Sequence, residues 1–236
     1  DGGNPAASEA VRRGWVSIQD EASQLVASLV SVQPGHTVLD LCAAPGGKTM
    51  RLALDAGPTG RVIAADLHAH RVRAMADRIG RAGIRNVETL TLDATIPLPA
   101  EPPFDRRFDR ILVDVPCSGT GTLARHPEIR WRLRPGDLQE LHARQTALFR
   151  NALQYLAPGG RLVYSTCSLE PDENERVVQE LLFTAQNAVH IVSPRKTIEP
   201  FLSAHVNVDS LVDANGFFRT FPPDHRTDGF FAAVIE

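Results

Sequence analysis

The sequence predicts an α/β protein built on one mostly parallel, doubly wound sheet with helices on both faces. Three observations lead to this prediction. Short apolar runs alternate with amphipathic stretches, which is the pattern of repeated strand–helix–strand units. Loops rich in glycine or proline separate these runs without dividing the chain. The length of 236 residues suits one substantial domain.

Residues 1–13 are predicted to be a linker or the remnant of a truncated N-terminal segment. Residues 1–5 read Asp-Gly-Gly-Asn-Pro, a composition that favours turns and cannot begin a packed element. Because the first residue is not methionine, we expect residues 14–236 to be one domain of a longer protein. The first helix is predicted at residues 20–31, where apolar side chains repeat at helical spacing: Ala22, Leu25, Val26, Leu29 and Val30.

The remaining elements follow in alternation. Strands are predicted at residues 37–41, 61–65, 87–91, 110–115 and 161–165, with a short strand at 190–193 and a closing strand at 229–235. Helices are predicted at residues 48–55, 70–82, 137–156 and 172–184. Asp172 and Glu175 have the spacing of a capping box, which predicts that Asp172 caps the last helix.

The charge and the cysteine content argue against several classes of protein. The net charge of −3 is not that of a strongly basic nucleic-acid-binding domain. Cys42, Cys117 and Cys167 lie far apart and form no C-x-x-C pair, so we expect neither a disulfide framework nor a metal site. No apolar run approaches the roughly 18–20 residues that a membrane helix needs, and nothing resembles a signal peptide. We therefore expect a cytoplasmic monomer with no membrane partner.

Basic residues nevertheless gather in two places. One group follows the helix at residues 70–82 and its exit: Arg71, Arg73, Arg78, Arg81 and Arg85. The other surrounds Trp131: Arg125, His126, Arg130, Arg132, Arg134 and Arg144. Each group is either a nucleic-acid-binding surface or a solvated face. Trp131 either stacks on an RNA base or packs in the core.

A glycine turn follows the strand at residues 37–41, at the sheet edge where α/β proteins bind nucleotides. It consists of Cys42, Ala43, Ala44, Pro45, Gly46, Gly47, Lys48 and Thr49. A P-loop would need glycine at position 42, and the dinucleotide fingerprint G-x-G-x-x-G is absent. S-adenosylmethionine, which carries no phosphate, is the remaining candidate ligand.

Acidic residues at the ends of three further strands support that ligand. Asp66 ends the second strand, where a carboxylate can accept hydrogen bonds from both ribose hydroxyls. Asp93 follows the third strand, in a position to meet the adenine edge, and Asp114 ends the fourth. Any one of these could be a turn or cap residue, but their recurrence along consecutive strands favours cofactor binding.

Two cysteines are predicted to meet at the same edge. Cys117 follows the fourth strand in a Pro-Cys motif, and Cys167 follows the fifth in a Thr-Cys motif. In a doubly wound sheet these strands lie side by side next to the first, so both thiols should converge on the glycine turn. This convergence indicates chemistry rather than packing, whereas Cys42 is interpreted as a packing residue within the cofactor turn.

These motifs resemble those of the Sun/Fmu family of bacterial ribosomal RNA cytosine-C5 methyltransferases and their eukaryotic Sun-type relatives. The resemblance covers roughly residues 14–182, and the tail at 229–231 fits more weakly. The matching stretches are residues 19–23, 40–49, 114–121, 125–128 and 164–168, with Glu170, Asn174 and Glu175 following. Members often carry an RNA-binding domain ahead of the catalytic one, and the resemblance does not extend to such a domain.

The resemblance implies a Rossmann-like class I methyltransferase fold, with a seven-stranded sheet and one antiparallel strand near its end. It implies methyl transfer from S-adenosylmethionine to C5 of cytosine, with Cys167 adding to C6 as the nucleophile. Asp114 would hold the base at N3 and N4, and Cys117 would help the methylated base to leave. Lys48, one of two lysines in the chain, would favour the thiolate form of Cys167.

The RNA-binding residues expected from this interpretation follow the Pro-Cys motif: Arg125, His126, Arg130, Trp131 and Arg132. The resemblance implies small-subunit (16S) ribosomal RNA as the substrate, with transfer RNA as the enzymatic alternative. A non-catalytic ribosome-assembly factor that binds RNA is the alternative from another class, although such a factor needs neither Cys117 nor Cys167. A DNA cytosine methyltransferase fits less well, because those enzymes usually rely on one nucleophile in a Pro-Cys motif.

Overall fold

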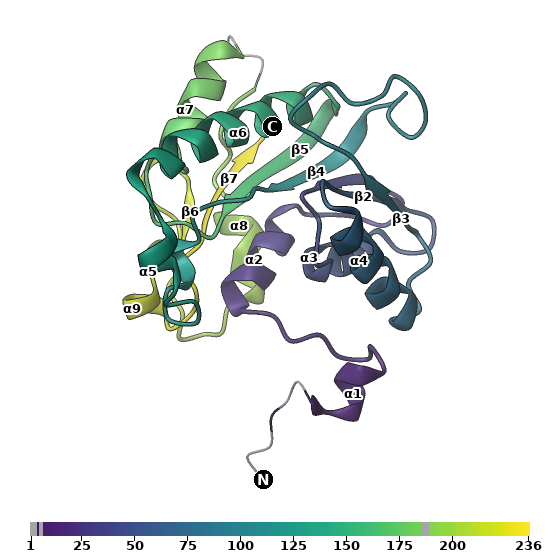
Figure 1. The fold of residues 1–236 in the computed structure, drawn as a ribbon, viewed down its shortest axis with the longest axis horizontal. Coiled ribbons are helices and arrows are strands. Elements are labelled where there is room, and N and C mark those ends of the chain that lie inside the picture. The colour runs from purple at the N-terminus through teal and green to yellow at the C-terminus, as the bar shows by residue number, and fades with distance from the viewer. Residues whose placement is uncertain (1–3, 5–6, 186–188) are drawn as a thin grey trace.

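The computed structural model describes residue 4 and residues 7–185 and 189–236. Its centre is a seven-stranded sheet in the order β3-β2-β1-β4-β5-β7-β6 (Figure 1). The strands are β1 (Thr37–Leu41), β2 (Arg61–Asp66), β3 (Val87–Thr91), β4 (Phe108–Asp114), β5 (Leu156–Thr166), β6 (Phe218–Arg219) and β7 (Phe231–Ile235). Neighbours from β3 to β5 are parallel, and β7 is antiparallel to both β5 and β6. The predicted fold class is confirmed.

Helices cover both faces of this sheet. In chain order they are α1 (Glu9–Arg12), α2 (Glu21–Leu29), α3 (Gly47–Ala56), α4 (Ala69–Arg81), α5 (Ile129–Arg132), α6 (Pro135–Leu153), α7 (Glu175–Thr184), α8 (Arg195–Ile198) and α9 (Pro222–His225). Short 3₁₀ turns lie at Thr120–Thr122, Glu199–Phe201 and Val208–Ser210. None of the helices in the described part of the chain is long and apolar enough to cross a membrane.

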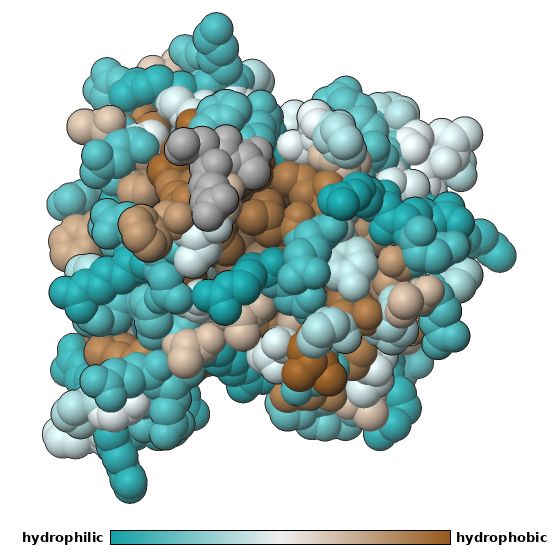
Figure 2. Space-filling view, turned by 90° about the horizontal axis from the view of Figure 1, so that it is seen from above, coloured by the Kyte–Doolittle hydropathy of each residue, from teal (hydrophilic) through white to brown (hydrophobic). Residues whose placement is uncertain are grey.

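Alternate residues of each strand face opposite layers of helices. Leu39 and Leu41 of β1 pack in the core with α6 and α7, whereas Val38 packs in the core with α2, α3 and α8. Because both sides of the strand are buried, β1 reads as a continuous apolar run apart from Asp40. The face that carries α6 and α7, at the top of Figure 1, is mostly hydrophilic in Figure 2 and shows a few apolar patches.

Several local predictions differ from the structure, including the start of β5, which lies at Leu156 instead of residue 161. Helix α7 begins at Glu175 with Asn174 as its N-cap residue, so Asp172 is not the cap and instead pairs with Arg176. Asn174 accepts a hydrogen bond from Thr166 Oγ1 (2.6 Å) and donates one to the carbonyl of Ser168 (2.9 Å), which fixes the start of the helix. Helix α6 ends at Leu153, three residues before the predicted end. The predicted strand at 190–193 is reduced to a single bridge between Ile191 and Ile235, and β6 was not predicted.

The predicted linker falls partly outside the described residues, which omit 1–3 and 5–6. Within it, α1 forms a single helical turn capped by Ser8, whose hydroxyl accepts from the Val11 amide. None of its side chains is buried, so this turn contributes no packing to the domain core.

Candidate active site

The glycine turn folds tightly against α4. Cys42 and Gly46 have positive φ angles of 62° and 93°, and Gly46 is the N-cap of α3. A Cβ atom on Gly46 would lie 2.7 Å from Cγ of Met75, so at this positive φ only glycine fits without strain and without displacement of the Met75 side chain. The turn therefore exposes its backbone at the carboxyl end of β1, where a ligand can approach closely.

Asp66 is buried beneath this turn. One oxygen accepts from the Ala44 amide at 3.3 Å, the other accepts from the His68 amide at 3.1 Å, and Arg71 forms an ion pair with the carboxylate at 3.3 Å. Arg71 also donates to the Ala44 carbonyl at 2.6 Å. The second predicted carboxylate, Asp93, is exposed and accepts two hydrogen bonds from Thr95. Both aspartates line one small cavity with Cys42 and Arg144.

A second cavity lies on the other side of Cys42. It is lined by the turn from Ala43 to Lys48, by Gln19 at the start of α2, and by Asp40 and Asp114. Gln19 donates to Ser23 Oγ at 2.8 Å and would lie 3.5 Å from a Cβ atom on Gly47. The sequence motif at residues 19–23 thus forms a wall of the candidate cofactor site.

Asp40 was missed as a site residue. Its carboxyl is buried, one oxygen accepts from Thr49 Oγ1 at 2.6 Å, and Oδ1 has no hydrogen-bond partner among the described residues. Burial raises the pKa of Asp40 to about 7. A buried, unpaired carboxyl oxygen on a cavity wall is suited to a cationic or hydrogen-bond-donating ligand group. The sequence signal was an aspartate at the fourth position of an otherwise apolar strand.

Lys48 and Asp114 form the polar centre of the site. The Nζ atom of Lys48 lies 2.8 Å from Oδ2 of Asp114 and 5.1 Å from the centre of the Phe230 ring. Ser165 Oγ donates to the other oxygen of Asp114 at 2.7 Å. The side chains of Lys48 and Asp114 are 13% and 28% exposed, so both are largely shielded from solvent. The remaining exposed part of Asp114 can contact a ligand in the cavity that it lines.

The structure brings Cys117 and Cys167 together, as the topology predicted. Their Sγ atoms are 3.3 Å apart. A hydrogen bond from the Cys117 thiol lowers the pKa of Cys167, and the positive charge of Lys48 contributes to the same effect. The same hydrogen bond, together with burial, raises the pKa of Cys117. The pair therefore favours a thiolate on Cys167 and a protonated Cys117.

Glu173, which the sequence reasoning missed, joins the two cysteine loops. It is fully buried and accepts from the amide and hydroxyl of Ser118, from the hydroxyl of Ser168 (2.5 Å), and from Nε2 of Gln145 (2.9 Å). Ser118 follows Cys117 and Ser168 follows Cys167 in the chain, so one carboxylate fixes both neighbours of the thiol pair. The only sequence signal was its place in the acidic stretch after the Thr-Cys motif.

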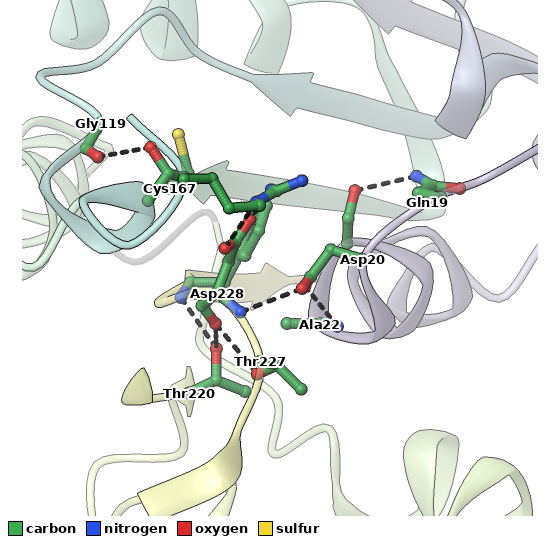
Figure 3. A network of polar contacts seen from close by, with 12 residues as sticks. Gln19, Asp20, Ala22, Gly119, Cys167, Thr220, Thr227 and Asp228 are labelled. Atoms are coloured by element: carbon green, nitrogen blue, oxygen red, sulfur yellow. Dashed lines mark hydrogen bonds and ion pairs between the residues drawn. The ribbon is translucent and has the colours of Figure 1, made fainter. Parts of the chain in front are cut away.

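A second network holds the Cys167 loop from the other side. The Gly121 amide donates to the Cys167 carbonyl at 3.0 Å, and the Gly229 amide donates to the Gly121 carbonyl at 2.8 Å. A Cβ atom on Gly121 would overlap the Gly229 carbonyl, so this approach requires glycine. Asp228 pairs with Arg125, and its amide donates to Asp20 at 3.0 Å. Figure 3 shows this network, with Cys167 at one side and the start of α2 at the other.

The predicted RNA-binding residues divide into two kinds. Arg125 is bound to the buried carboxylate of Asp228, and His126 lies 3.2 Å from Glu128. Three side chains of α5 are exposed: Trp131 is 89% exposed, and the arginines on either side of it are exposed as well. The structure thus excludes core packing for Trp131, one of its two predicted alternatives.

Comparison with known proteins gives a consistent result. Residues 27–236 match the family described as 16S rRNA methyltransferase RsmB/F. The Probable ribosomal RNA small subunit methyltransferase B of Synechocystis sp. is 37% identical over 94% of this chain and 48% of its own length. The Ribosomal RNA small subunit methyltransferase B of Enterobacter sp. is 38% identical over 87% of this chain and 46% of its own length. The chain therefore spans about half the length of these curated relatives.

A solved structure extends the likeness to the whole chain. NSun6 from Pyrococcus horikoshii, whose crystal structure was determined with SFG, aligns with a TM-score of 0.81 at 28% identity. The alignment covers 99% of this chain and 56% of the NSun6 chain. The resemblance inferred from the motifs is thereby confirmed.

Proposed function

The chain belongs to the RsmB/F family of 16S rRNA methyltransferases, and we propose that it transfers a methyl group from S-adenosylmethionine to C5 of cytosine in small-subunit ribosomal RNA. The observation that carries this proposal is the thiol pair of Cys117 and Cys167, 3.3 Å apart beside Asp114. We also propose a cytoplasmic location, which agrees with a ribosomal RNA substrate.

The glycine turn and its two flanking cavities fit S-adenosylmethionine. The unpaired oxygen of Asp40 suits the ammonium group of the methionine part, since a buried carboxyl oxygen needs a donor. Asp66 and Asp93 line the other cavity and can accept from ribose hydroxyls and the adenine amino group. When bound, S-adenosylmethionine supplies a methyl group on a cationic sulfur. The relative that was solved with SFG supports the same ligand class.

Cys167 acts as the nucleophile in this proposal. C5 of cytosine is too electron-poor to attack a sulfonium methyl group directly. Addition of the Cys167 thiolate to C6 makes C5 nucleophilic, so that C5 can accept the methyl group. A base then removes the proton from C5, and the C6–S bond breaks to release the thiolate. The net products are 5-methylcytosine, S-adenosylhomocysteine and one proton.

Asp114 and Lys48 position the base and stabilise charge. One oxygen of Asp114 accepts a hydrogen bond from Ser165 and the other accepts one from Lys48. These two bonds fix the plane of the carboxyl group. In that orientation it can bind N4 of cytosine as an acceptor, and it can bind N3 when one proton is shared between them. The ammonium group of Lys48 lies 2.8 Å from Asp114 and contributes to the lowered pKa of Cys167.

Cys117 acts after methyl transfer. The pKa of Cys117 is raised by its hydrogen bond to Cys167 and by burial, which keeps Cys117 protonated while Cys167 is the thiolate. Once Cys167 is bonded to C6, that hydrogen bond no longer has a thiolate acceptor. Without this hydrogen bond the main cause of the raised pKa is gone, so Cys117 can lose its proton to solvent and, as a thiolate, accept the proton from C5 so that the C6–S bond breaks.

The two cysteines can be separated by experiment. Cys117→Ala should still attack and methylate RNA, but it should accumulate a protein–RNA adduct that survives denaturing electrophoresis. Cys167→Ala should form no adduct and show no methylation. The double variant is the matched control, because loss of the adduct there assigns the bond to Cys167. An adduct in Cys167→Ala alone would show that Cys117 is the nucleophile and Cys167 the thiol that assists release. Activity close to wild type in both single variants would refute the mechanism.

A further inference from the structure

A third cavity lies beside Cys117, between the Pro-Cys loop, α5 and the first turns of α6. It has a volume of about 450 Å³ and is separate from the two cavities at the glycine turn. This volume falls within the roughly 300–1,000 Å³ of ligand pockets. Ile129, Leu133 and Leu141 supply apolar walls. Arg132 and Arg144 supply guanidinium groups, and Asp137 and Glu140 supply carboxylates.

The arginines of this cavity lack protein partners. Within residues 7–185 and 189–236, the side chains of Arg132 and Arg144 form no hydrogen bond or ion pair, whereas those of Arg125 and Arg150 pair with Asp228 and Glu180. Arg144 is half-buried, and a half-buried guanidinium without a carboxylate partner suits a ligand that brings phosphate or acceptor atoms. The cavity therefore combines an apolar wall with two unpaired guanidinium groups and two carboxylates, a set that can stack on a nucleotide base and hydrogen-bond its acceptor and donor groups.

We propose that this cavity is a subsite for the nucleotide next to the target cytosine in the RNA strand, an inference that rests on the proposed function. Cys117 lines the cavity and also contacts Cys167, so an occupant is the direct neighbour of the base that Cys167 attacks. Bases in single-stranded RNA are bound by stacking on apolar, aromatic and guanidinium surfaces. The apolar wall and the guanidinium of Arg132 offer such surfaces.

The test uses Arg132 because its effect can be isolated. Arg144 also lines the cavity with Asp66 and Asp93, so its removal would disturb the cofactor as well. Arg130 is the matched control for Arg132: both are exposed arginines of α5, and only Arg132 lines the cavity. Loss of general phosphate attraction should therefore be similar in Arg130→Ala and Arg132→Ala.

The probe is a fragment of 16S ribosomal RNA containing the cytosine that the wild-type protein methylates, located by bisulfite sequencing of a methylated transcript. Fragments with an abasic residue on either side of that cytosine are compared with the intact fragment by fluorescence anisotropy. We expect one abasic position to weaken wild-type binding by about tenfold. That penalty should fall to about twofold in Arg132→Ala and stay near tenfold in Arg130→Ala. Leu141→Trp, which fills the cavity without a change in charge, should also lower the penalty.

Two results would overturn the subsite. Equal affinity for the intact and both abasic fragments would show that no neighbouring base is bound. Equal penalties in Arg130→Ala and Arg132→Ala would show that the cavity does not bind it. In both cases wild-type methylation of the transcript would leave the proposed function standing. A transcript without 5-methylcytosine would instead refute the proposed function, and this subsite with it.

Discussion

The loops that carry the two cysteines and the short helix α5 are neighbours at one edge of the sheet, yet they are stabilised differently. Around Cys117 and Cys167, hydrogen bonds from Ser118, Ser168 and Gln145 converge on the buried carboxylate of Glu173. In α5 only Ile129 is buried, and Trp131 projects into solvent.

This difference matches the tasks proposed for the two regions. Covalent attack requires atoms held close to a productive geometry, and buried hydrogen-bonded side chains provide that. Binding of a flexible RNA strand needs surface charge and a stacking ring, which can adjust on contact. Removal of a hydrogen-bond partner should therefore lower the free energy of unfolding strongly in the cysteine loops and only slightly in α5.

The largest effect is expected for Glu173→Gln. In Gln the amide oxygen can keep the bonds from the Ser118 amide and Gln145, but the NH2 group would face the hydroxyls of Ser118 and Ser168, which donate to Glu173 and would have to reverse. The negative charge that strengthens all four bonds would also be lost. We expect the free energy of unfolding to fall by about 4 kcal/mol, and alkylation of Cys167 by iodoacetamide to change in rate. Urea denaturation and mass spectrometry would measure the two effects. Glu180→Gln, which alters an exposed ion pair with His142 and Arg150, should cost less than about 1 kcal/mol. Similar losses of unfolding free energy in both variants would show that Glu173 is no more important for stability than an exposed ion pair.

The next effect concerns pH and Asp40. The pKa of Asp40 is raised by burial to about 7 in the folded protein, whereas the unfolded carboxyl titrates near 3.8. Between these values the folded state binds more protons, so this residue lowers stability progressively as the pH rises. Wild type should lose about 3 kcal/mol relative to Asp40→Asn between pH 5 and pH 8. Denaturation of both proteins across this range would measure it, and parallel curves would show that Asp40 is ionised throughout.

A smaller effect is expected at the cofactor side of the edge. Asp66→Ala removes the carboxylate that holds the Ala44 amide and Arg71, and that we assign to the ribose. Affinity for S-adenosylmethionine should fall by about 1.5–3 kcal/mol, the range for a hydrogen bond to a charged group. Calorimetry on the folded variant would test this. Unchanged affinity would remove Asp66 from the site.

The smallest effect is expected in α5. Replacement of both Arg130 and Arg132 by alanine should lower the slope of log affinity against log salt for single-stranded RNA by about 1.4. Arg125→Ala should change the slope less, because that guanidinium is already paired with Asp228. Salt titrations of RNA binding would compare them. A larger change for Arg125→Ala would mean that the ion pair opens when RNA binds.

The sequence by itself predicted the five parallel strands, the closing strand, and the edge at which the glycine turn and the two cysteines meet. Strands β1 and β3 have the predicted bounds. Four of the five residues of β1 are buried, whereas β3 lies at the sheet edge with no buried residue and mixes apolar and polar side chains. The motifs around Cys42, Cys117 and Cys167 follow strands whose order in the sheet can be inferred from the alternating pattern. In a parallel sheet, the ends of such strands meet at one edge.

Tertiary structure alone decided which distant side chains hold that edge. Ser118 and Glu173 are 55 residues apart, Arg125 and Asp228 are 103 apart, and Asp20 and Asp228 are 208 apart. Tertiary packing also makes Asn174, and not Asp172, the N-cap residue of α7. It leaves one oxygen of Asp40 without a hydrogen-bond partner among the described residues. Local spacing records which residues are buried and how the backbone turns. It does not record which buried polar groups become partners, because that depends on where loops far apart in the chain come to lie once the sheet has closed over its core.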